Sequence, residues 1–415
     1  MPKQGEKLLI VGGGIIGLST GYYALKAGFS VTVLERGAET GANCSSANAG
    51  MIVPSHFTPL AAPGVMTQGL RWLLNPESPF AIKPGVSLDM ARWGWLFYLH
   101  SNAEHVKASR ELLCQLHLES RQLFTELAET EDFGLETRGL IMLCRTAKAL
   151  EVEAELAKQA KALGLHTEVL DGAGLAKLDP AIEMDVEGGV HFAEDAHLDP
   201  GKLMSILRCR IKEMGGELIY GCAIEELHKE GGSLKAISGP YGSYEADHFV
   251  VAGGSWTPML VKTLGLSLPI QPGKGYSLTL EKPTQLPTIC SILTEARVAV
   301  TPMGESLRIA GTMEIGGLNH KINPRRIKGI LKSIQHYYPA IKESDFDGLE
   351  PWVGLRPVSP DGLPYLGPIP GVDNLVIASG HAMMGLSLGP VTGKRVTGML
   401  SGDAPIPQLD PARFD

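Results

Sequence analysis

The strongest constraint on the fold lies near the N-terminus, where a short apolar run meets three closely spaced glycines. Residues 8–11 (LLIV) have the composition of a strand buried on both faces, and Gly12, Gly14 and Gly17 follow with the spacing GxGxxG. A helical pattern over residues 16–26 comes next. In such a strand–turn–helix unit, the glycines allow a tight turn, a close approach of the backbone to a bound group, and close packing of the helix on the strand. The pattern predicts the first unit of a parallel, doubly wound sheet.

The same unit indicates a ligand. A second strand-like run, SVTVLE, ends in Glu35, twenty-three residues after Gly12. A carboxylate at this distance accepts hydrogen bonds from an adenosine ribose, while the helix N-terminus binds the pyrophosphate. We therefore predict a bound dinucleotide, and NAD and FAD are both alternatives at this point because they share this geometry. The polar stretch at residues 41–50 (GANCSSANAG) either contacts this cofactor or forms an ordinary loop.

Composition argues against several other classes of protein. The 415 residues suffice for about two or three domains at roughly 150 residues per domain. A formal net charge of −8, without a run of Lys and Arg, argues against nucleic-acid binding. The six cysteines show no paired Cys or Cys/His spacing, so we predict no metal site and no disulfides, as is typical of a reduced, cytoplasmic protein. The apolar run at residues 8–18 is too short to span a bilayer.

The remainder of the chain alternates between helical and strand-like segments. Apolar residues at helical spacing predict a helical insertion over 89–163 and a helix from Pro200 to the glycines at 215 and 216. A small antiparallel meander follows and leads into the buried strand HFVV. Strand-like runs over 270–315 precede a helix predicted at 324–337. Near the C-terminus, a strand, a glycine-rich loop and a helix follow one another, and this helix is predicted to begin near Gly385.

A single arginine among apolar residues is the most informative side chain of the C-terminal third. Arg356 lies in the segment WVGLRPVSPDGLPYLG. Because burial of an unpaired charge is costly, such an arginine pairs either with an acid of the protein or with an anionic ligand. Asp361 and Glu350 are the internal candidates, whereas a carboxylate ligand suits the planar, bidentate guanidinium. His381, in the loop SGHAMMG, is either a proton-transfer group or a pocket-lining residue.

Several motifs together resemble one family over nearly the whole chain. They are the glycine fingerprint, SSANAG, TPLAAPGV, KGYSLTL, EARVAV, and GLRPVSPDGLPYLG with SGHAMMGLSLG. On these residues the chain resembles the D-amino acid oxidase superfamily of FAD enzymes. Within it, the chain is most similar to the family of bacterial D-amino acid dehydrogenase catalytic (small) subunits. The resemblance favours FAD over NAD as the dinucleotide.

The resemblance implies an α/β fold built from two interleaved domains. A Rossmann-like FAD-binding domain, with a parallel sheet and a three-stranded meander, is expected from residues 1–85, 166–264 and 346–415. An α+β substrate-binding domain built on an antiparallel sheet is expected from residues 86–165 and 265–345.

The resemblance also assigns roles to individual residues. In such enzymes the arginine of the GLRP motif clamps the substrate carboxylate, which implies this role for Arg356. Tyr276 is a candidate carboxylate or pocket partner, with a sheet-packing aromatic as the alternative, and His381 completes the candidate catalytic set. Glycine oxidases of the superfamily carry a tyrosine where this chain has RVAVTP, and this departure disfavours that activity. The expected FAD-binding residues are Gly12, Gly14, Ile15, Ile16, Gly17, Glu35, Arg36, Ser45, Ser46, Ala47, Asn48, Ala49, Ile224, Ala252, Gly253, Gly380, Gly385, Leu386 and Ser387.

The mode of flavin binding follows from a second comparison within the superfamily. Sarcosine oxidase relatives attach FAD through a cysteine near the position of residues 355–357, where this chain has none. We therefore expect noncovalent FAD. The helix expected to begin near Gly385 would direct its N–H groups and positive end toward the negative charge of reduced flavin.

The expected activity is oxidative deamination of D-amino acids. Hydride passes from Cα to flavin N5, the imino acid is hydrolysed to a 2-oxo acid and ammonia, and electrons pass to quinone or another acceptor. The alternatives are a D-proline or D-hydroxyproline dehydrogenase, a glycine- or sarcosine-type amine oxidase, and a noncatalytic flavin-binding subunit of a larger complex. The aromatic segment at 91–100 either contacts the inner face of a membrane peripherally or is a core helix, the reading we favour. The preferred side chain, the acceptor, the need for a partner subunit and the oligomeric state stay open.

Overall fold

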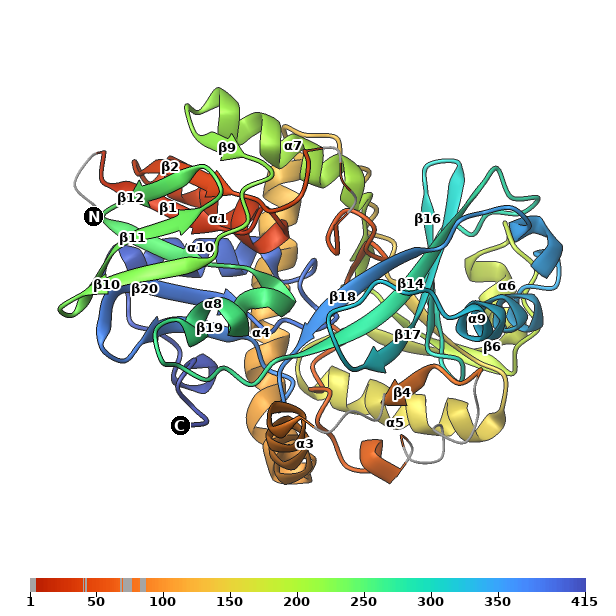
Figure 1. The fold of residues 1–415 in the computed structure, drawn as a ribbon. Helices are drawn as coiled ribbons and strands as arrows, with labels where there is room; N and C mark the ends of the chain where they lie inside the picture. The colour runs from red at the N-terminus through yellow and green to blue at the C-terminus, as the bar shows by residue number, and fades with distance from the viewer. Residues whose placement is uncertain (1–4, 40, 42, 68, 70–76, 83–86) are drawn as a thin grey trace.

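Two large β-sheets organise the chain and lie next to each other in Figure 1. The computed structural model describes residues 5–39, 41, 43–67, 69, 77–82 and 87–415. The combination of a parallel sheet, a three-stranded meander and a mainly antiparallel second sheet confirms the predicted fold class.

The first sheet has the strand order β19-β20-β13-β1-β2-β9 among the described residues. All its strands run parallel except β19, which pairs antiparallel with β20 at the edge. The predicted buried run LLIV forms the central strand β1, whose residues 8–11 are all buried. The strands are β1 (Lys7–Val11), β2 (Ser30–Leu34), β9 (Glu217–Ile219), β13 (His248–Val251), β19 (Tyr365–Ile369) and β20 (Val372–Ser379).

Helices cover one face of this sheet and the predicted meander covers the other. Helices α1 and α10 cross closely, because a Cβ atom at Gly393 would lie only 2.5 Å from the carbonyl carbon of Ser19. On the opposite face the meander β10-β11-β12 buries Leu234 and Ile237 against the sheet. These elements are α1 (Ile15–Lys26), α7 (Pro200–Glu213), β10 (Glu226–Glu230), β11 (Ser233–Gly239), β12 (Gly242–Glu245), α8 (Thr257–Lys262) and α10 (Gly389–Leu400).

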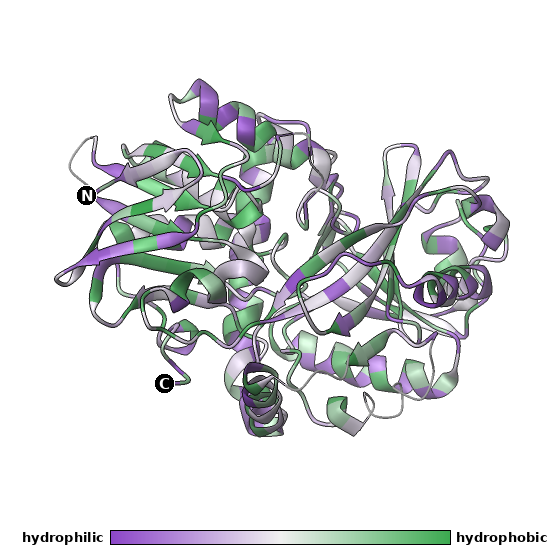
Figure 2. Ribbon diagram, in the orientation of Figure 1, coloured by the Kyte–Doolittle hydropathy of each residue, from purple (hydrophilic) through white to green (hydrophobic). Residues whose placement is uncertain are grey.

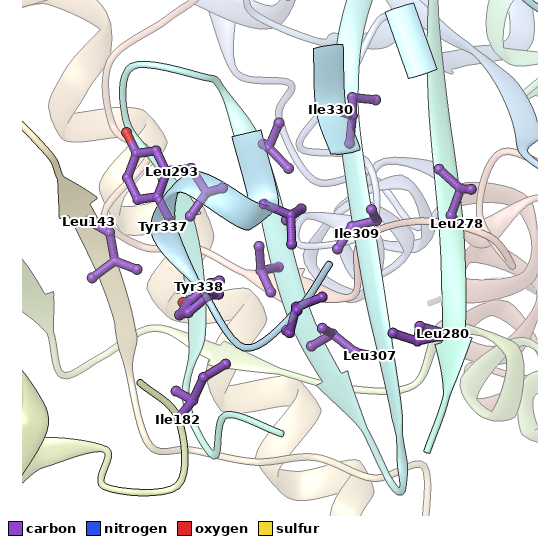
Figure 3. Packing of buried hydrophobic residues seen from close by; sticks show 14 of the residues in the cluster. Leu143, Ile182, Leu278, Leu280, Leu293, Leu307, Ile309, Ile330, Tyr337 and Tyr338 are labelled. Atoms are coloured by element: carbon purple, nitrogen blue, oxygen red, sulfur yellow. The ribbon is translucent and has the colours of Figure 1, made fainter. Parts of the chain in front are cut away.

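The second sheet has the order β18-β14-β17-β16-β15-β5-β7-β6, with β4 paired to β17. Side chains alternate between its two faces. One face packs Leu143, Leu278 and Ile309 together with Ile330 of α9, as Figure 3 shows. On the other face, α5 packs Ala157 against Met142. The elements are β4 (Phe80–Ile82), β5 (Leu140–Cys144), α5 (Ala147–Ala162), β6 (Thr167–Asp171), α6 (Gly172–Leu178), β7 (Gly188–Phe192), β14 (Gln271–Glu281), β15 (Cys290–Leu293), β16 (Val298–Met303), β17 (Ser306–Ile315), α9 (Pro324–Tyr337) and β18 (Trp352–Val358).

The remaining elements belong to neither of the two large sheets. Strands β3 and β8 form a two-stranded ribbon, and the long helix α4 follows α3 after a two-residue break. The bounds are β3 (Met51–Ile52), α3 (Leu88–His100), α4 (Ala103–Ala128), β8 (Ala196–His197) and the 3-10 turns Gly254–Trp256, Glu343–Phe346 and Pro407–Leu409.

The strand pairing revises the sequence-based division of the chain. β6 and β7 belong to the second sheet, although residues 166–264 were assigned to the FAD-binding domain. β4 and β18 also pair in the second sheet, although they fall within 1–85 and 346–415. Conversely, α4 of the segment 86–165 packs Leu113 and Leu116 into the core of the first sheet. Strand partners far away in sequence decide these memberships, and the local pattern does not contain them.

The helix over the aromatic segment is only half-buried. In α3, Trp93 and Phe97 are buried, whereas Trp95 and Tyr98 are about 60% exposed, so the segment 91–100 is not a core helix.

The ribbon in Figure 2 carries apolar residues mainly along the strands of the first sheet, whereas apolar and polar residues alternate along the outer helices. In the part of the chain that the structure describes, no helix has both the length and the hydropathy needed to cross a bilayer.

Candidate active site

A cavity of about 1220 Å³ lies where the two sheets meet. Its walls come from the carboxyl ends of β1, β2 and β13, from the loop at 43–49, and from one face of the second sheet. Ligands of open parallel sheets bind at the carboxyl ends of the strands. The cavity is large and continuous enough for a dinucleotide with a second, small molecule beside it.

The turn after β1 forms one end of this cavity. Gly12 has a positive φ of 113°, and a Cβ atom there would lie 2.5 Å from the carbonyl oxygen of Ala252. At Gly17 a Cβ atom would lie 1.8 Å from the carbonyl oxygen of Gly12. Both positions therefore require glycine, for the turn and for helix packing respectively. The first-turn N–H groups of a helix lack partners within the helix, so those of Gly14 and Ile16 at the cavity wall are available to a phosphate.

Glu35 stands at the end of β2, as predicted. Its two carboxylate oxygens accept hydrogen bonds from the N–H groups of Gly13 and Gly37, both at 2.7 Å. These bonds fix the carboxylate at the cavity wall, and each oxygen keeps a lone pair for a ribose hydroxyl. Beside it, the guanidinium of Arg36 stacks 4.1 Å above the ring of Trp256, and both residues line the cavity.

The polar loop at 43–49 is held from both sides. Ser45 Oγ accepts from the N–H of Ile15 at 2.9 Å, which ties the loop to α1. From the second sheet, Ser277 Oγ donates to the carbonyl of Ala47, and Arg308 Nη1 donates to the carbonyl of Asn48. The loop is therefore not an ordinary surface loop, because both sheets fix its backbone beside the cavity.

Arg356 lies on the face of the second sheet that turns toward the cavity. On this face β18 and β14 present Gly354 and Gly275, which are direct cross-strand partners. A Cβ atom at Gly275 would lie 1.9 Å from Arg356 Nη1, so the guanidinium lies across this glycine. The half-buried arginine thus lies over Gly275 at the cavity wall, beside the ring of Trp352, which lies over Gly354.

The guanidinium of Arg356 has no acidic partner among the residues that the structure describes. Its Nη1 donates to the carbonyl of Thr312 at 2.8 Å. Asp361, proposed as one internal partner, instead forms a salt bridge with Arg413. Burial lowers the pKa of Arg356, although a guanidinium keeps its charge at any physiological pH. A half-buried cation without an acidic partner at a cavity wall fits an anionic ligand.

Backbone geometry aims the Thr312 carbonyl at this arginine. Thr312 has a positive φ of 72°, which is rare for a β-branched residue. The pairing of β14 with β17 shifts between Lys274 and Tyr276, so β17 carries one extra residue here. Such a bulge leaves one residue out of the ladder and redirects its groups. The carbonyl of Thr312 is thereby free to accept from Arg356.

Tyr276 is among the residues around the cavity, but its hydroxyl is engaged by protein partners, which argues against the expected role of carboxylate partner. Neighbouring strand residues point to opposite faces, so Tyr276 points away from the floor formed by Gly275. Its side chain is 1% exposed, its hydroxyl donates to Glu314, and it accepts from the N–H of Asn323. The phenol is engaged on the far face of the sheet, as expected for a sheet-packing aromatic.

His381 lines the cavity as a neutral group. Burial lowers the pKa of His381 to about 3, so the imidazole binds no proton at neutral pH. Its Nε2 lies 3.0 Å from Thr392 Oγ1, and its buried Nδ1 has no partner in the described protein. These properties favour the pocket-lining interpretation over that of a general base.

The helix predicted to begin near Gly385 starts later. α10 begins at Gly389, and residues 382–388 form turns. Hydrogen bonds from the N–H of Leu388 to Met384 and from the N–H of Gly389 to Leu386 hold these turns. The sequence suggested Gly385 because glycine marks a loop end, but Pro390 in the first turn of α10 marks its N-terminus.

Most of the predicted cofactor residues meet at this cavity. Those that do not line it have other roles: Ser387 Oγ accepts from the N–H of Val53, and Ser46 Oγ from the N–H of Asn43. Gly380 packs against the Tyr365 ring, which leaves no room for a Cβ atom. The residues that line the cavity are Gly12, Gly14, Ile15, Ile16, Glu35, Arg36, Ser45, Ala47, Asn48, Ala49, Ile224, Ala252, Gly253, Gly385 and Leu386, together with Tyr276, Arg356 and His381.

Sequence reasoning missed other cavity residues. Trp352 and Gly275 belong to the quoted motifs, and the alternation of β14 and β18 would have placed them beside Arg356. Cys44 lies next to Gly354, where a Cβ atom would approach its Sγ to 3.1 Å. No sequence signal connects these two segments, because they are more than three hundred residues apart.

The residues of the cavity fit FAD. The backbone turn at Gly12 has room only for glycine, and the cavity continues to the unpaired Nδ1 of His381. Between them lie the N–H groups of the first turn of α1 and the loop at 43–49. In the described residues no group of three or more His, Cys, Asp and Glu side chains is arranged to hold a metal ion.

Curated relatives agree with this assignment. The chain is 33% identical over 408 residues to a D-amino acid dehydrogenase of Methylobacterium radiotolerans, covering 96% of both chains. It is 31% identical over 413 residues to a D-amino acid dehydrogenase of Granulibacter bethesdensis, again covering 96% of both.

Solved structures share the fold at lower identity. Glycine oxidase from Geobacillus kaustophilus superposes with a TM-score of 0.78 at 22% identity, covering 99% of this chain and 100% of the other. L-proline dehydrogenase from P. horikoshii superposes with a TM-score of 0.73 at 17% identity, covering 100% and 98%. The family model described as FAD dependent oxidoreductase (DAO) matches residues 7–399. With the cavity described above, these matches identify the chain as an enzyme of the DAO family of FAD-dependent oxidoreductases.

Proposed function

We propose that this enzyme catalyses the oxidative deamination of D-amino acids and passes the electrons to quinone or another acceptor. The observation that carries the proposal is the unpaired guanidinium of Arg356 on a floor of glycine in the cavity wall. Relatives at 31–33% identity over nearly the whole chain bear the name D-amino acid dehydrogenase, which supports the same substrate class.

The site acts mainly by positioning its substrate. Arg356 is the expected carboxylate clamp, because a guanidinium and a carboxylate form two parallel hydrogen bonds that fix orientation. Gly275 and Gly354 leave space for the guanidinium of Arg356 and the ring of Trp352 to lie flat on the sheet, at the wall of the cavity that would hold substrate and flavin. Bound FAD supplies the hydride acceptor for the Cα hydrogen of the substrate. A fixed orientation of reacting groups accounts for a large part of the rate gain in such reactions.

Proton transfer does not require His381 in this proposal. The substrate amine must be neutral when it is oxidised, and His381 is a weak base because burial lowers its pKa to about 3. The amine therefore loses its proton to solvent, and the imino acid product reacts with water. The unpaired Nδ1 of His381 remains available to the cofactor in the cavity wall.

The exposed face of α3 supports a peripheral membrane contact for electron transfer. Trp95 and Tyr98 stack on one another at a centroid distance of 5.8 Å and are exposed, as are Leu88 and Leu99. Aromatic and aliphatic residues on one exposed helix face suit the interface of a membrane, where quinones dissolve. We place the protein on the cytoplasmic side of that membrane, in agreement with its six unpaired cysteines.

Anaerobic mixing tests the activity directly. Single D-amino acids, their L-enantiomers, glycine and D-proline are added to the yellow protein, and the flavin absorbance near 450 nm is followed. Bleaching by D-amino acids and not by L-enantiomers is expected. Bleaching by glycine or D-proline alone would assign the enzyme to one of those activities, and no bleaching by any amine would leave only a flavin-binding subunit.

Replacement of Arg356 by Met removes the proposed carboxylate clamp. We expect the KM for the substrate to rise about 100-fold, because charge-assisted hydrogen bonds are lost, while FAD stays bound. Steady-state kinetics and the ratio of flavin to protein absorbance measure these quantities. Arg145→Met, which removes an exposed ion pair with Asp185, is the matched control and should leave the KM unchanged. An unchanged KM in Arg356→Met would refute the clamp.

Gly275→Ala tests the same site without changing its charge. The new methyl group would lie 1.9 Å from Arg356 Nη1, so the guanidinium must move. We expect the KM to rise about tenfold, which corresponds to about 1.4 kcal/mol, with a normal flavin content. Gly94→Ala is the control, because Gly94 also lines the cavity but has no atom within 4 Å of an added Cβ. Equal KM values in the two variants would contradict the arrangement described.

We also propose that the flavin is bound noncovalently. Cys44 lies beside Gly354, but burial raises the pKa of its thiol and so disfavours the reactive thiolate. Precipitation of the protein with trichloroacetic acid should release all yellow colour into the supernatant. Flavin retained in the pellet would contradict noncovalent binding, and its loss from the pellet of Cys44→Ser would then identify the attachment site.

A further inference from the structure

A buried carboxylate lines the cavity at the side away from Arg356. Glu153 belongs to α5, is 3% exposed and contributes to the cavity wall. Among the residues that the structure describes, it forms no hydrogen bond and lies within no salt bridge. Burial raises the pKa of Glu153, and the nearby charge of Arg297 lowers it. The carboxylate oxygens of Glu153 are not among the buried atoms that lack a partner, so they face the open space of the cavity, where a donor on the ligand can reach them.

A row of short side chains leads across the sheet toward this carboxylate. The positions are direct cross-strand neighbours on the cavity face, because the registers of consecutive strand pairs bring them side by side. Small side chains in the middle of the row leave a channel above the sheet. In order from β18 to β5 the row is Trp352, Ser277, Ala310, Ala299, Ile292 and Met142.

Only an amino acid with a long side chain can approach the far end of this channel. The Arg356 guanidinium contacts Thr312 on β17, and three strand spacings separate β17 from β5. At about 4.8 Å per spacing this is roughly 14 Å. α5 packs on β5 from the cavity side, through contacts of Ala157 with Met142. A substrate held at Arg356 therefore directs its side chain toward the helix that carries Glu153, the yellow helix beside the second sheet in Figure 1.

The surroundings of Glu153 favour a neutral partner. Arg297, an exposed residue that also lines the cavity, lies near enough to lower the pKa of Glu153, so a second cation gains little there. His56, the other titratable group of this wall, is neutral because burial lowers its pKa to about 4, and Ser55 Oγ lies 3.1 Å from its Nδ1. Together, Glu153 and Arg297 offer one acceptor and one set of donors with no net charge. A primary amide or a hydroxyl complements such a pair.

We propose that Glu153 binds the side-chain end of the substrate, and that the enzyme prefers D-amino acids with a neutral side chain ending in a hydrogen-bond donor. This inference rests on the proposed function. An apolar end group would leave the carboxylate without a donor, whereas an amide or hydroxyl would satisfy it. Glu153 is therefore a specificity-determining residue and has no part in the chemical step.

Substrate pairs of similar length test the inference. The value of kcat/KM is measured for D-glutamine, D-methionine and D-lysine with the FAD-loaded enzyme and with Glu153→Leu. We expect kcat/KM for D-glutamine to fall about 10- to 100-fold in Glu153→Leu, while that for D-methionine stays within about twofold. Glu151→Leu is the matched control, because Glu151 is an exposed residue of the same helix, and it should change neither value.

Each other outcome overturns the inference. An equal change for D-glutamine and D-methionine would show a structural role for Glu153, and a preference for D-lysine that disappears in Glu153→Leu would show a cationic end group instead. If Glu153→Leu lacks FAD or unfolds early, Glu153→Met, which also removes the acceptor, carries the same test, with the same selective loss for D-glutamine expected. If wild-type flavin is reduced by no D-amino acid, the proposed function itself fails. Reduction by D-amino acids without this selectivity refutes only the role of Glu153.

Discussion

The structure of the site depends on a cation that the protein leaves without a counter-charge. Arg356 lies across Gly275, and the carbonyl of Thr312 holds one of its nitrogens. A bulge in β17 and a strained φ at Thr312 make that carbonyl available. Strained backbone persists only where the surrounding structure fixes it, and it concentrates at functional sites. The neighbouring acid Asp361 is occupied by Arg413, so among the described residues no acid neutralises the positive charge at the cavity wall.

The elements of the first sheet were predictable because their signals are local. The run at 8–11, the glycine spacing and the acid at Glu35 lie within one βαβ unit, and the structure places them as expected. The helix at 324–337 also has the predicted bounds, since Asn323 caps it and Pro324 starts it. Motif similarity likewise placed Arg356 at the cavity, where the local pattern alone left its partner open.

Other features depend on contacts that no local pattern contains. β7 pairs with β5 and β6 pairs with β7, so both strands belong to the second sheet, and the sequence boundary at 166 does not follow the sheets. Tyr276 was assigned to the site from its motif, but strand alternation turns its phenol to Glu314 on the other face. The sequence did not indicate that Glu153 is buried. An acidic residue on an amphipathic helix is expected to face solvent, and only the packing of the helix against the rest of the protein shows otherwise. Burial of a charged group is decided by tertiary structure alone.

Hydrogen bonds from the second sheet to the loop at 43–49 make the cofactor-binding wall depend on the contact between the two sheets. Ser277 and Arg308 hold the carbonyls of Ala47 and Asn48, while Ser45 joins the same loop to α1. The loop is thus bonded to both halves of the molecule and forms part of the wall of the cofactor cavity. Because residues of both sheets hold this part of the cavity wall, the cofactor-binding surface is complete only when the two sheets are docked.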